Sequence, residues 1–300
     1  MPVKPHENVN VLPIEGSGRV VARHDRRLGA ILAEHGKLGP GDVERLLELQ
    51  QGEGIRFGEA ALRAGLITEG DLRSALARQF DYPHLLPGTG GVSTEIVVAY
   101  EPLHPRAEEM RALRTQLQIR WSNAGVRHRV LAIASPGPGE GRSYVAASLA
   151  VAFSQLGERT LLIDADLRSP RQHRIFDVPD RIGLSAVLSG RADRGAVVPV
   201  SRFGTLSLLP SGAVPPNPQE LLSRHTLAAL LEELRADFDV ILFDTPAANQ
   251  YADAQSVAFR AGSVMVLARK DHTRLADTNG VIRHLKDTGA RVVGTVLNVF

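Results

Sequence analysis

Two patterns of hydrophobic positions divide the chain. Between residues 27 and 79, apolar residues recur three and four positions apart, as in helices with one buried face. From residue 129 onward, short apolar runs alternate with helical stretches. After a first strand and helix, the expected elements are strands at 161–163, 240–243, 264–268 and 292–297 and helices at 226–235, 252–260 and 273–288. This alternation predicts a doubly wound α/β fold with a mainly parallel sheet.

The helical part is an internal repeat. RLGAILAEHGKLGPGDVERLLELQ aligns without gaps to RFGEAALRAGLITEGDLRSALARQ, 29 residues further on. Each copy predicts a short helix, a turn at Gly36 or Gly65, and a second helix, and Thr68 with Asp71 resembles a helix N-cap pair. We therefore expect a smaller N-terminal all-α repeat domain at residues 27–90.

The remaining segments predict a tail, a connection and one more helix. Residues 1–26 are polar and without period, which indicates a flexible tail. Residues 80–105 are rich in Pro and Gly, so we expect a linker at 91–104 between the repeat and a second domain at 105–300. Residues 106–122 predict a helix with Met110, Leu113, Leu117 and Trp121 on one stripe.

Composition narrows the possible environments and partners. The net charge is +2 and the basic residues are spread out, so we expect no nucleic-acid polymer as a partner. The absence of cysteine excludes disulfides and thiolate metal sites. No apolar stretch is long enough to span a bilayer. We expect a cytoplasmic protein, recruited to the inner membrane by a partner.

A glycine- and proline-rich loop joins the first strand to an alanine-rich helix in RVLAIASPGPGEGRSYVAASLA. Such a unit presents backbone N–H groups and a positive helix end to phosphate oxygens. Gly141 and Ser143 match the P-loop pattern G-x-x-x-x-G-K-[ST], whereas Pro136 replaces its first Gly and Arg142 replaces its Lys. The segment predicts a nucleotide site, with a plain strand-to-helix turn as the alternative.

Acidic residues follow two later strands. Asp164, Asp166 and Arg168 stand at the carboxyl end of the strand at 161–163, and Asp244 ends the strand at 240–243. In an open α/β sheet that edge is where ligands bind. Carboxylates placed so close together repel each other unless a cation or proton intervenes. Together with the loop, these residues predict binding of ATP with Mg²⁺.

The order of these motifs resembles the bacterial tyrosine kinases (BY-kinases) that partner polysaccharide chain-length determinants. Their mark is an Asp-x-Asp-x-Arg motif after the P-loop, and DLRSPRQHRIF, GLSAVLSG, PPNPQELL and EEMRALR are further family-like stretches. The resemblance covers residues 105–300, and with the N-terminal repeat it is closest to the EpsG-type chain-length-determinant tyrosine kinases of exopolysaccharide loci. It implies a P-loop NTPase fold and an ATP-dependent protein-tyrosine kinase. It also implies a membrane chain-length determinant as partner and self-association into a ring.

The resemblance implies roles for individual residues. The catalytic candidates are Asp164, which would accept the proton of a tyrosine, with Asp166 and Arg142. The nucleotide-binding candidates are Gly137, Gly139, Gly141, Arg142, Ser143, Tyr144 and Asn298. The metal candidates are Ser143, Asp166 and Asp244, and which aspartate takes which role stays open. Asn298 either contacts the adenine or forms a strand-end turn.

The helix at 106–122 carries a further family-like motif. Glu108, Arg111 and Arg114 match the E-x-x-R-x-x-R motif that joins neighbouring subunits in BY-kinase rings. The simpler interpretation is a solvated helix face with an ion pair three residues apart.

The N-terminal repeat resembles the MshEN domain at the front of type II secretion and pilus ATPases, members of which bind cyclic di-GMP. The resemblance implies ligand contacts at Arg27, Leu28, Gly29, Leu47, Gln50, Arg56, Gly58, Leu72, Leu76 and Gln79. The alternative is a helical protein-interaction module without a ligand. Val43, Phe57 and Ala61 depart from the family pattern.

Three functions compete. The first is a tyrosine kinase that controls exopolysaccharide polymerisation or export. The second is a ParA/MinD-like ATPase switch, although Ser135 and Pro136 stand where those proteins typically carry an early Lys. The third is a degenerate kinase that acts as a cyclic di-GMP-responsive scaffold.

The tyrosines limit where the chain could phosphorylate itself. No tyrosine cluster follows the last strand, where BY-kinases commonly phosphorylate one, and the four tyrosines are Tyr82, Tyr100, Tyr144 and Tyr251. We expect autophosphorylation to use one of these, or the enzyme to act on another protein.

Overall fold

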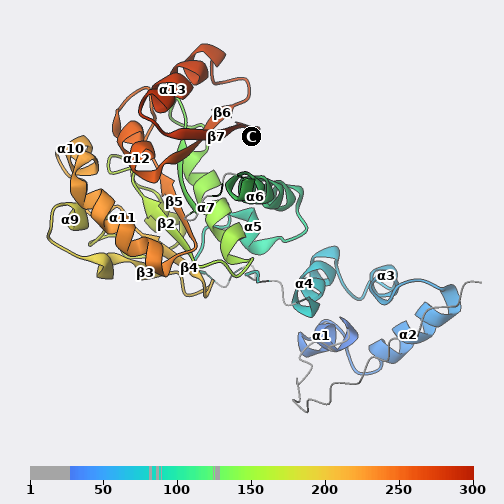
Figure 1. Cartoon of the computed structure of the whole chain (residues 1–300). Helices are drawn as coiled ribbons and strands as arrows, with labels where there is room; N and C mark the ends of the chain where they lie inside the picture. The colour runs from blue at the N-terminus through green and yellow to red at the C-terminus, as the bar shows by residue number, and fades with distance from the viewer. Residues whose placement is uncertain (1–27, 81–82, 86–87, 89, 124, 126–128) are drawn as a thin grey trace, which may run out of the picture.

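The structure, a computed structural model, describes residues 28–80, 83–85, 88, 90–123, 125 and 129–300. The expected tail at 1–26 and the first residue of the repeat, Arg27, lie outside these residues. The described chain forms a group of four helices, α1 to α4, and an α/β body that contains the sheet (Figure 1).

A seven-stranded sheet runs through the α/β body in the order β3-β4-β2-β5-β1-β6-β7. The strands are β1 (Arg129–Ala134), β2 (Thr160–Asp164), β3 (Val198–Pro199), β4 (Leu206–Leu209), β5 (Val240–Asp244), β6 (Ser263–Arg269) and β7 (Arg291–Asn298). Neighbouring strands are parallel except β3 and β4, which pair antiparallel. The expected doubly wound, mainly parallel fold is confirmed. Because β5 lies between β1 and β2, the strand that ends in Asp244 separates the strand before the loop from the strand that ends in Asp164.

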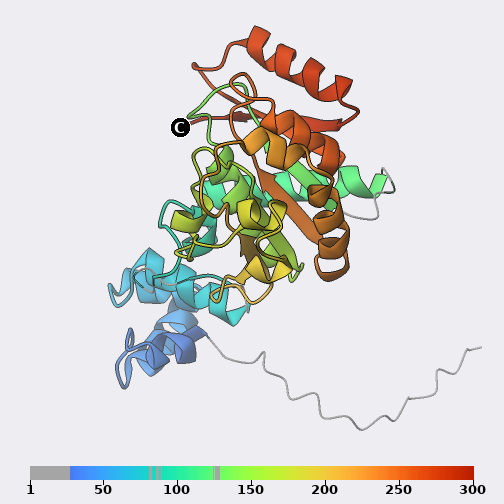
Figure 2. The same ribbon diagram turned by 90° about the vertical axis from the view of Figure 1, so that its left-hand side faces the viewer.

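Helices cover both faces of this sheet (Figures 1 and 2). On one side lie α5 (Val97–Tyr100), α6 (Pro105–Asn123), α7 (Arg142–Ser154) and α8 (Gln172–Ile175). On the other side lie α9 (Leu184–Leu188), the 3₁₀ helix η1 (Arg194–Ala196), α10 (Pro218–Ser223), α11 (His225–Asp237), α12 (Asp253–Ala261) and α13 (Leu275–Asp287). Successive residues of β1 pack into the cores on opposite faces of the sheet. Leu131 and Ile133 belong to one core, and Val130 and Ala132 belong to the other. This alternation follows from the two-residue period of a strand, and it makes β1 apolar throughout.

The segment expected as a linker, residues 91–104, is in large part packed into the α/β body. Ile96, Val98 and Ala99 are buried, and they belong to the core cluster that contains α6 and α7. The side chain of Gln155, at the end of α7, donates to the carbonyl of Val98 at 2.9 Å. The Pro and Gly residues that predicted a connection surround a short apolar run, VVAY. Composition alone does not reveal that this run is buried.

The N-terminal repeat folds as two helical hairpins with a core of their own. Its helices are α1 (Leu28–Glu34), α2 (Asp42–Glu53), α3 (Phe57–Arg63) and α4 (Glu69–Gln79). The predicted turns at Gly36 and Gly65 adopt positive φ angles of 65° and 66°. The N-terminal helical region is thus confirmed.

Glycines let the two copies of the repeat pack closely on each other. A Cβ atom on Gly29 would lie 2.9 Å from the ring of Phe57, and one on Gly58 would lie 2.6 Å from Leu72 and 3.5 Å from Leu28. The second position of each copy, Leu28 or Phe57, therefore lies against the glycine of the other copy. This reciprocal contact explains why the two copies share glycine at this position.

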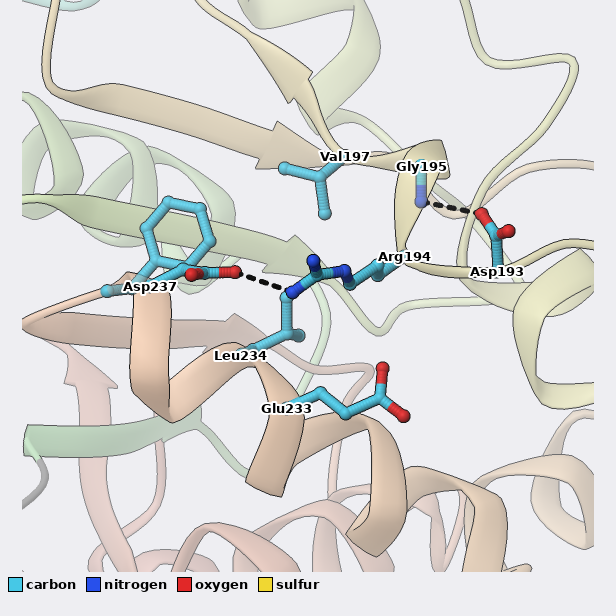
Figure 3. A pocket seen from close by; sticks show the side chains of 8 residues that line it. Asp193, Arg194, Gly195, Val197, Glu233, Leu234 and Asp237 are labelled. Carbon is cyan, nitrogen blue, oxygen red and sulfur yellow. Dashed lines mark hydrogen bonds and ion pairs between the residues drawn. The ribbon is translucent and has the colours of Figure 1, made fainter.

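Two cavities lie away from the phosphate loop. One, of about 570 Å³, is lined by η1 and by residues 233–238 at the end of α11 (Figure 3). Residues 233–238 precede β5, so this cavity adjoins the amino end of that strand, whereas Asp244 lies at its carboxyl end. The other, of about 540 Å³, lies between α4 and residues 100–102, just before α6. Among the described residues, no helix has the length and apolar character needed to cross a membrane.

Candidate functional site

The loop between β1 and α7 has the geometry of a phosphate cradle. Gly139 and Gly141 adopt positive φ angles of 69° and 94°, a region that favours glycine. A Cβ atom on Gly141 would lie 2.1 Å from Nδ2 of Asn298, so any larger residue would strain this backbone and displace Asn298. The 13-residue helix α7 begins at the next residue, and its free N–H groups and dipole favour bound anions.

The Arg142 side chain fixes the phosphate loop through hydrogen bonds. Its Nε donates to the carbonyl of Thr245 at 2.8 Å, and its Nη1 donates to the carbonyl of Gly137 at 2.6 Å and to the Ser135 hydroxyl. The guanidinium thus ties the start of the loop to the residue after Asp244. A lysine ammonium lacks the planar fork that satisfies these separate acceptors together.

Glu140 is a buried acidic residue inside the loop that the sequence did not single out. Its side chain is 2% exposed. The carboxylate accepts a hydrogen bond from the Gly137 N–H at 2.8 Å and another from the Thr273 hydroxyl. Nδ2 of Asn298 donates to the Glu140 carbonyl at 3.1 Å, so Asn298 lies against the phosphate loop. The loop is therefore fastened to the residues before α13 and to the end of β7.

Asp164 and Asp244 lie side by side at the carboxyl ends of β2 and β5. They are direct partners in the register of the two strands. Both are buried, at 0% and 1% exposed. Oδ2 of Asp164 accepts from the N–H groups of Arg171 and Gln172 at 3.0 and 2.9 Å. The other oxygen of each carboxylate, Oδ1, has no hydrogen-bond partner among the described residues.

This arrangement raises the proton affinity of both carboxylates. Burial raises the pKa of Asp164 well above its usual range, and the charge of Asp244 raises it further. Burial also raises the pKa of Asp244 to about 6, although hydrogen bonds from Gln172 and Ser143 oppose that shift. Two adjacent carboxylates with raised pKa values form a site that binds a proton or a cation strongly.

Gln172 connects the parts of the site, and sequence reasoning did not identify it. Its Nε2 donates to Oδ2 of Asp244 at 2.8 Å and to the carbonyl of Ser143 at 3.0 Å. The side chain is fully buried, and Oε1 has no hydrogen-bond partner among the described residues. A glutamine six residues after Asp166 is a weak signal in the sequence, because its reach to β5 depends on the fold.

Asp166 closes a turn beside that pair, and Arg168 reaches from the same turn to α12. Oδ1 of Asp166 accepts from the N–H groups of Arg168 and Ser169 at 3.2 and 2.9 Å, which closes a tight turn. Arg168 forms a two-bond ion pair with the buried Asp253, at 2.8 and 3.1 Å. Its guanidinium carbon lies 3.8 Å from the centre of the Tyr251 ring.

The residues present fit a magnesium ion with few protein ligands. Mg²⁺ prefers hard oxygen ligands and usually keeps several waters and substrate phosphates. The unpaired oxygen of Asp244, beside the phosphate loop, supplies such a ligand. Among the described residues, no group of three or more His, Cys, Asp or Glu side chains could hold a metal by itself. A metal here would therefore depend on nucleotide oxygens.

The ligand candidates of the N-terminal repeat divide into buried and exposed residues. Gly29 and Gly58 are buried and serve the packing described above. Leu47 is 39% exposed and Arg56 is exposed. Gln50, Leu72, Leu76 and Gln79 are half-buried. The exposed members remain available to a ligand, whereas the glycines have a structural role already.

The candidates for subunit contact on α6 are engaged within the chain. The side chain of Arg111 donates through Nε to Glu108 at 2.9 Å, as the ion-pair interpretation expected. Arg114 donates to the carbonyl of Ala152, at the end of α7, at 2.7 Å. On the other face, Met110, Leu117 and Trp121 are buried as the stripe predicted.

A family model and several curated proteins match the α/β body. Residues 129–280 match the model of the cellulose biosynthesis protein BcsQ. The chain is 38% identical over 174 residues to the tyrosine-protein kinase YwqD of Bacillus subtilis, covering 58% of this chain and 73% of YwqD. It is 32% identical over 198 residues to the putative tyrosine-protein kinase CapB of Staphylococcus aureus, covering 66% of this chain and 86% of CapB. In other tyrosine-protein kinases the matched region is 26–28% of a longer chain.

Solved structures give the same result for the fold. The chimerical protein CapA2B2 matches with a TM-score of 0.64 and 30% identity, over 75% of this chain and 98% of that one. The septum site-determining protein MinD of Pyrococcus horikoshii, complexed with Mg-ADP, matches with a TM-score of 0.51 and 29% identity, over 57% of this chain and 70% of that one.

Proposed function

This chain belongs to the bacterial tyrosine-kinase family, and we propose that it transfers the γ-phosphoryl group of ATP to tyrosine hydroxyls in the control of exopolysaccharide chain length or export. The observation that carries the proposal is the pair of buried carboxylates, Asp164 and Asp244, next to the phosphate loop. Each has an unpaired oxygen and a raised pKa. A plain strand-to-helix turn has no need of such a pair.

The residues of the site divide the work of phosphoryl transfer. The loop N–H groups with Gly137, Gly139 and Gly141 hold phosphate oxygens, and Arg142 fixes the loop and adds positive charge. Tyr144 and Asn298 contact the same nucleotide. Ser143, Asp166 and Asp244 hold Mg²⁺, which when bound neutralises charge on the transferring phosphoryl group. Asp164 accepts the proton of the tyrosine hydroxyl, because a carboxylate with a raised pKa is the stronger base.

The biological setting of the proposal comes from the relatives. Proteins named for capsule or exopolysaccharide regions are among the similar tyrosine kinases. We infer that this chain acts with a membrane chain-length determinant, which brings it to the inner membrane, and that Glu108, Arg111 and Arg114 contribute to a ring of subunits. Arg114 would have to leave the carbonyl of Ala152 to do so.

A phosphorylation assay tests the proposed chemistry. Purified protein, ATP and Mg²⁺ are incubated with a synthetic Glu–Tyr polymer, with and without the cytoplasmic segment of the membrane partner. We expect phosphotyrosine from the wild type and at least a hundredfold less from Asp164→Asn. The matched control is Asp237→Asn, at the end of α11 before β5, where an exposed ion pair with Arg194 contributes little (Figure 3). Equal activity of Asp164→Asn and the wild type would contradict the assignment.

A second candidate function is a nucleotide-dependent switch of the MinD type. The likeness to MinD favours it, since that protein binds Mg-ADP on a similar sheet. A switch hydrolyses or exchanges its nucleotide without producing phosphotyrosine. ATP turnover without phosphotyrosine, with the partner present, would favour the switch or a degenerate kinase that serves as a scaffold.

We also propose that the N-terminal repeat binds cyclic di-GMP. The exposed side chain of Arg56 offers a fork for a phosphate or a guanine edge, and the exposed Leu47 offers an apolar surface. Titration of labelled cyclic di-GMP into the full chain tests this. We expect binding at micromolar protein and at least tenfold weaker binding by Arg56→Gln, with Arg73→Gln, at an exposed position of α4, as the matched control. Absence of binding would leave the repeat as a protein-interaction module.

A further inference from the structure

The tyrosines of the described chain differ sharply in accessibility. Tyr100 is 9% exposed, and its hydroxyl donates to the carbonyl of Val92. Tyr144, in the first turn of α7, is half-buried and packs against the core. Tyr251 is 40% exposed. Tyr82 lies outside the described residues. A phosphoryl acceptor must enter an active site, so Tyr251 is the accessible candidate among the described tyrosines.

Tyr251 belongs to a segment that is anchored to the phosphate loop. It lies seven residues after Asp244, between β5 and α12. In this segment the N–H of Ala248 donates to the carbonyl of Ser135 at 2.9 Å, and the N–H of Asn249 donates to the carbonyl of Pro136 at 3.1 Å. The segment therefore shares the edge of the sheet where the candidate nucleotide site lies.

The ring of Tyr251 lies against a fixed cation. The guanidinium carbon of Arg168 is 3.8 Å from the ring centre, and that guanidinium is held by two hydrogen bonds to Asp253, which is fully buried. A cation over an aromatic face fixes the ring position. An arginine at that distance also offers charge-assisted hydrogen bonds to a phosphate, which would be strong partners. The surroundings thus hold the free side chain in place and set a single cation beside a phosphate on Oη.

We propose that Tyr251 is a site at which this kinase phosphorylates its own chain. The inference rests on the proposed tyrosine-kinase function. Oη of Tyr251 forms a bond to the γ-phosphorus of ATP while the bond from that phosphorus to the β–γ bridging oxygen breaks. ADP leaves with that oxygen, and the phenolic proton passes to the carboxylate of Asp164 in the subunit that catalyses the step.

Phosphorylation at this position changes the charge around Arg168. A phosphotyrosine adds close to two negative charges beside Asp166 and Asp253, both of which already face the same guanidinium. Three anionic groups would then compete for one cation. The modification is therefore suited to alter the turn that contains Asp166, a candidate metal ligand.

Mass spectrometry of the full chain tests the site. Wild type, Tyr251→Phe and Tyr82→Phe are each incubated with ATP and Mg²⁺, and labelling of an added Glu–Tyr polymer is measured in the same tubes. Tyr251→Phe keeps the ring over Arg168, so we expect it to fold and to label the polymer. We expect phosphate on Tyr251 in the wild type and at least fivefold less phosphate per chain in Tyr251→Phe, with Tyr82→Phe like the wild type.

The polymer separates failure of the site from failure of the function. Polymer labelling together with phosphate only on Tyr82, Tyr100 or Tyr144, or with no phosphate on the chain, would overturn the assignment of Tyr251 and leave the kinase function intact. Unchanged phosphate per chain in Tyr251→Phe would overturn it as well. No label on either polymer or chain would contradict both.

Discussion

Arg142 stands where the P-loop pattern has lysine, and its contacts predict what each substitution will do. Three oxygens, from Ser135, Gly137 and Thr245, accept its hydrogen bonds. In Arg142→Ala these oxygens lose their donor and the loop loses its cation, so we expect at least tenfold weaker ATP binding. Arg142→Lys keeps the charge but lacks the planar fork, so we expect it to bind ATP more weakly than the wild type and more tightly than Arg142→Ala. Calorimetric titration with ATP and Mg²⁺ measures both, and wild-type affinity in Arg142→Ala would contradict this role.

Asp244 makes magnesium binding depend on pH. Burial raises its pKa to about 6, so the metal-free protein prefers the protonated form below that pH. The stability that this proton contributes is present at low pH and is lost as pH rises through about 6. A bound cation replaces the proton, and we therefore expect Mg²⁺ with ADP to raise the melting temperature more at pH 7.5 than at pH 5. Asp244→Asn should remove most of this difference, and an equal rise at both pH values in the wild type would argue against it.

Some residues of the candidate site could be predicted from the sequence, and others could not. The glycines of the loop and the acidic strand ends were predictable, because turn geometry and strand ends constrain those residue types locally. Glu140 and Gln172 were not, because their functions depend on partners far along the chain. Glu140 bonds to Thr273, 133 positions away, and Gln172 bonds to Asp244, 72 positions away. Only the packed fold brings these residues together.

Helix α4 owes its first turn to a capping box. The Thr68 hydroxyl accepts from the Asp71 N–H at 3.2 Å, and the Asp71 carboxylate accepts from the Thr68 N–H at 3.0 Å. In the first copy of the repeat, Gly39 stands in place of Thr68, and α2 begins at Asp42, the counterpart of Asp71. We expect Thr68→Ala to destabilise α4 by about 1 kcal/mol. Faster hydrogen exchange of the first amides of α4, with α2 unchanged, would show this, and unchanged exchange throughout would contradict it.

The Asp71 carboxylate of the same cap makes the stability of the repeat depend on pH in acid. Hydrogen bonds from Lys37 and Thr68 lower the pKa of Asp71 to about 2. A lowered pKa means that the ionised carboxylate stabilises the fold above its unfolded pKa, near 3.9, and that this contribution is lost as pH falls through about 2. Asp71→Asn should therefore flatten the pH dependence of α4 exchange between pH 4 and 2. A dependence as steep as in the wild type would place the cause elsewhere.

The long helix α6 and the strands with uninterrupted apolar runs were predicted well, and the shortest elements were not. The stripe on α6 and the strands β5, β6 and β7 match their predictions to within a few residues. Strand β4 has four residues and α5 has four, too few for a period to show. The apolar run of α5 lies between proline- and glycine-rich stretches, which predicted a linker where the structure has core. Local composition misled here because burial depends on α6 and α7.

At the scale of the whole molecule, the repeat and the α/β body meet near the start of α6. The cavity between them is lined by His35, Lys37 and Arg78 on the repeat and by Tyr100 and Glu101 before α6. A ligand on the repeat could therefore act on α6, which carries Glu108. We predict that saturating cyclic di-GMP changes subunit assembly or ATP turnover at least twofold. Unchanged oligomer size and turnover across the titration would rule out such coupling.

The central claim is that the paired carboxylates beside the phosphate loop serve phosphoryl transfer to tyrosine and not a nucleotide switch. The most direct measurement is the number of phosphotyrosines formed per ADP released, with the Glu–Tyr polymer in excess and the cytoplasmic segment of the membrane partner present. We predict a ratio that approaches one as the polymer concentration rises, and loss of both products in Asp164→Asn. Steady ADP release with no phosphotyrosine at any polymer concentration would contradict the claim.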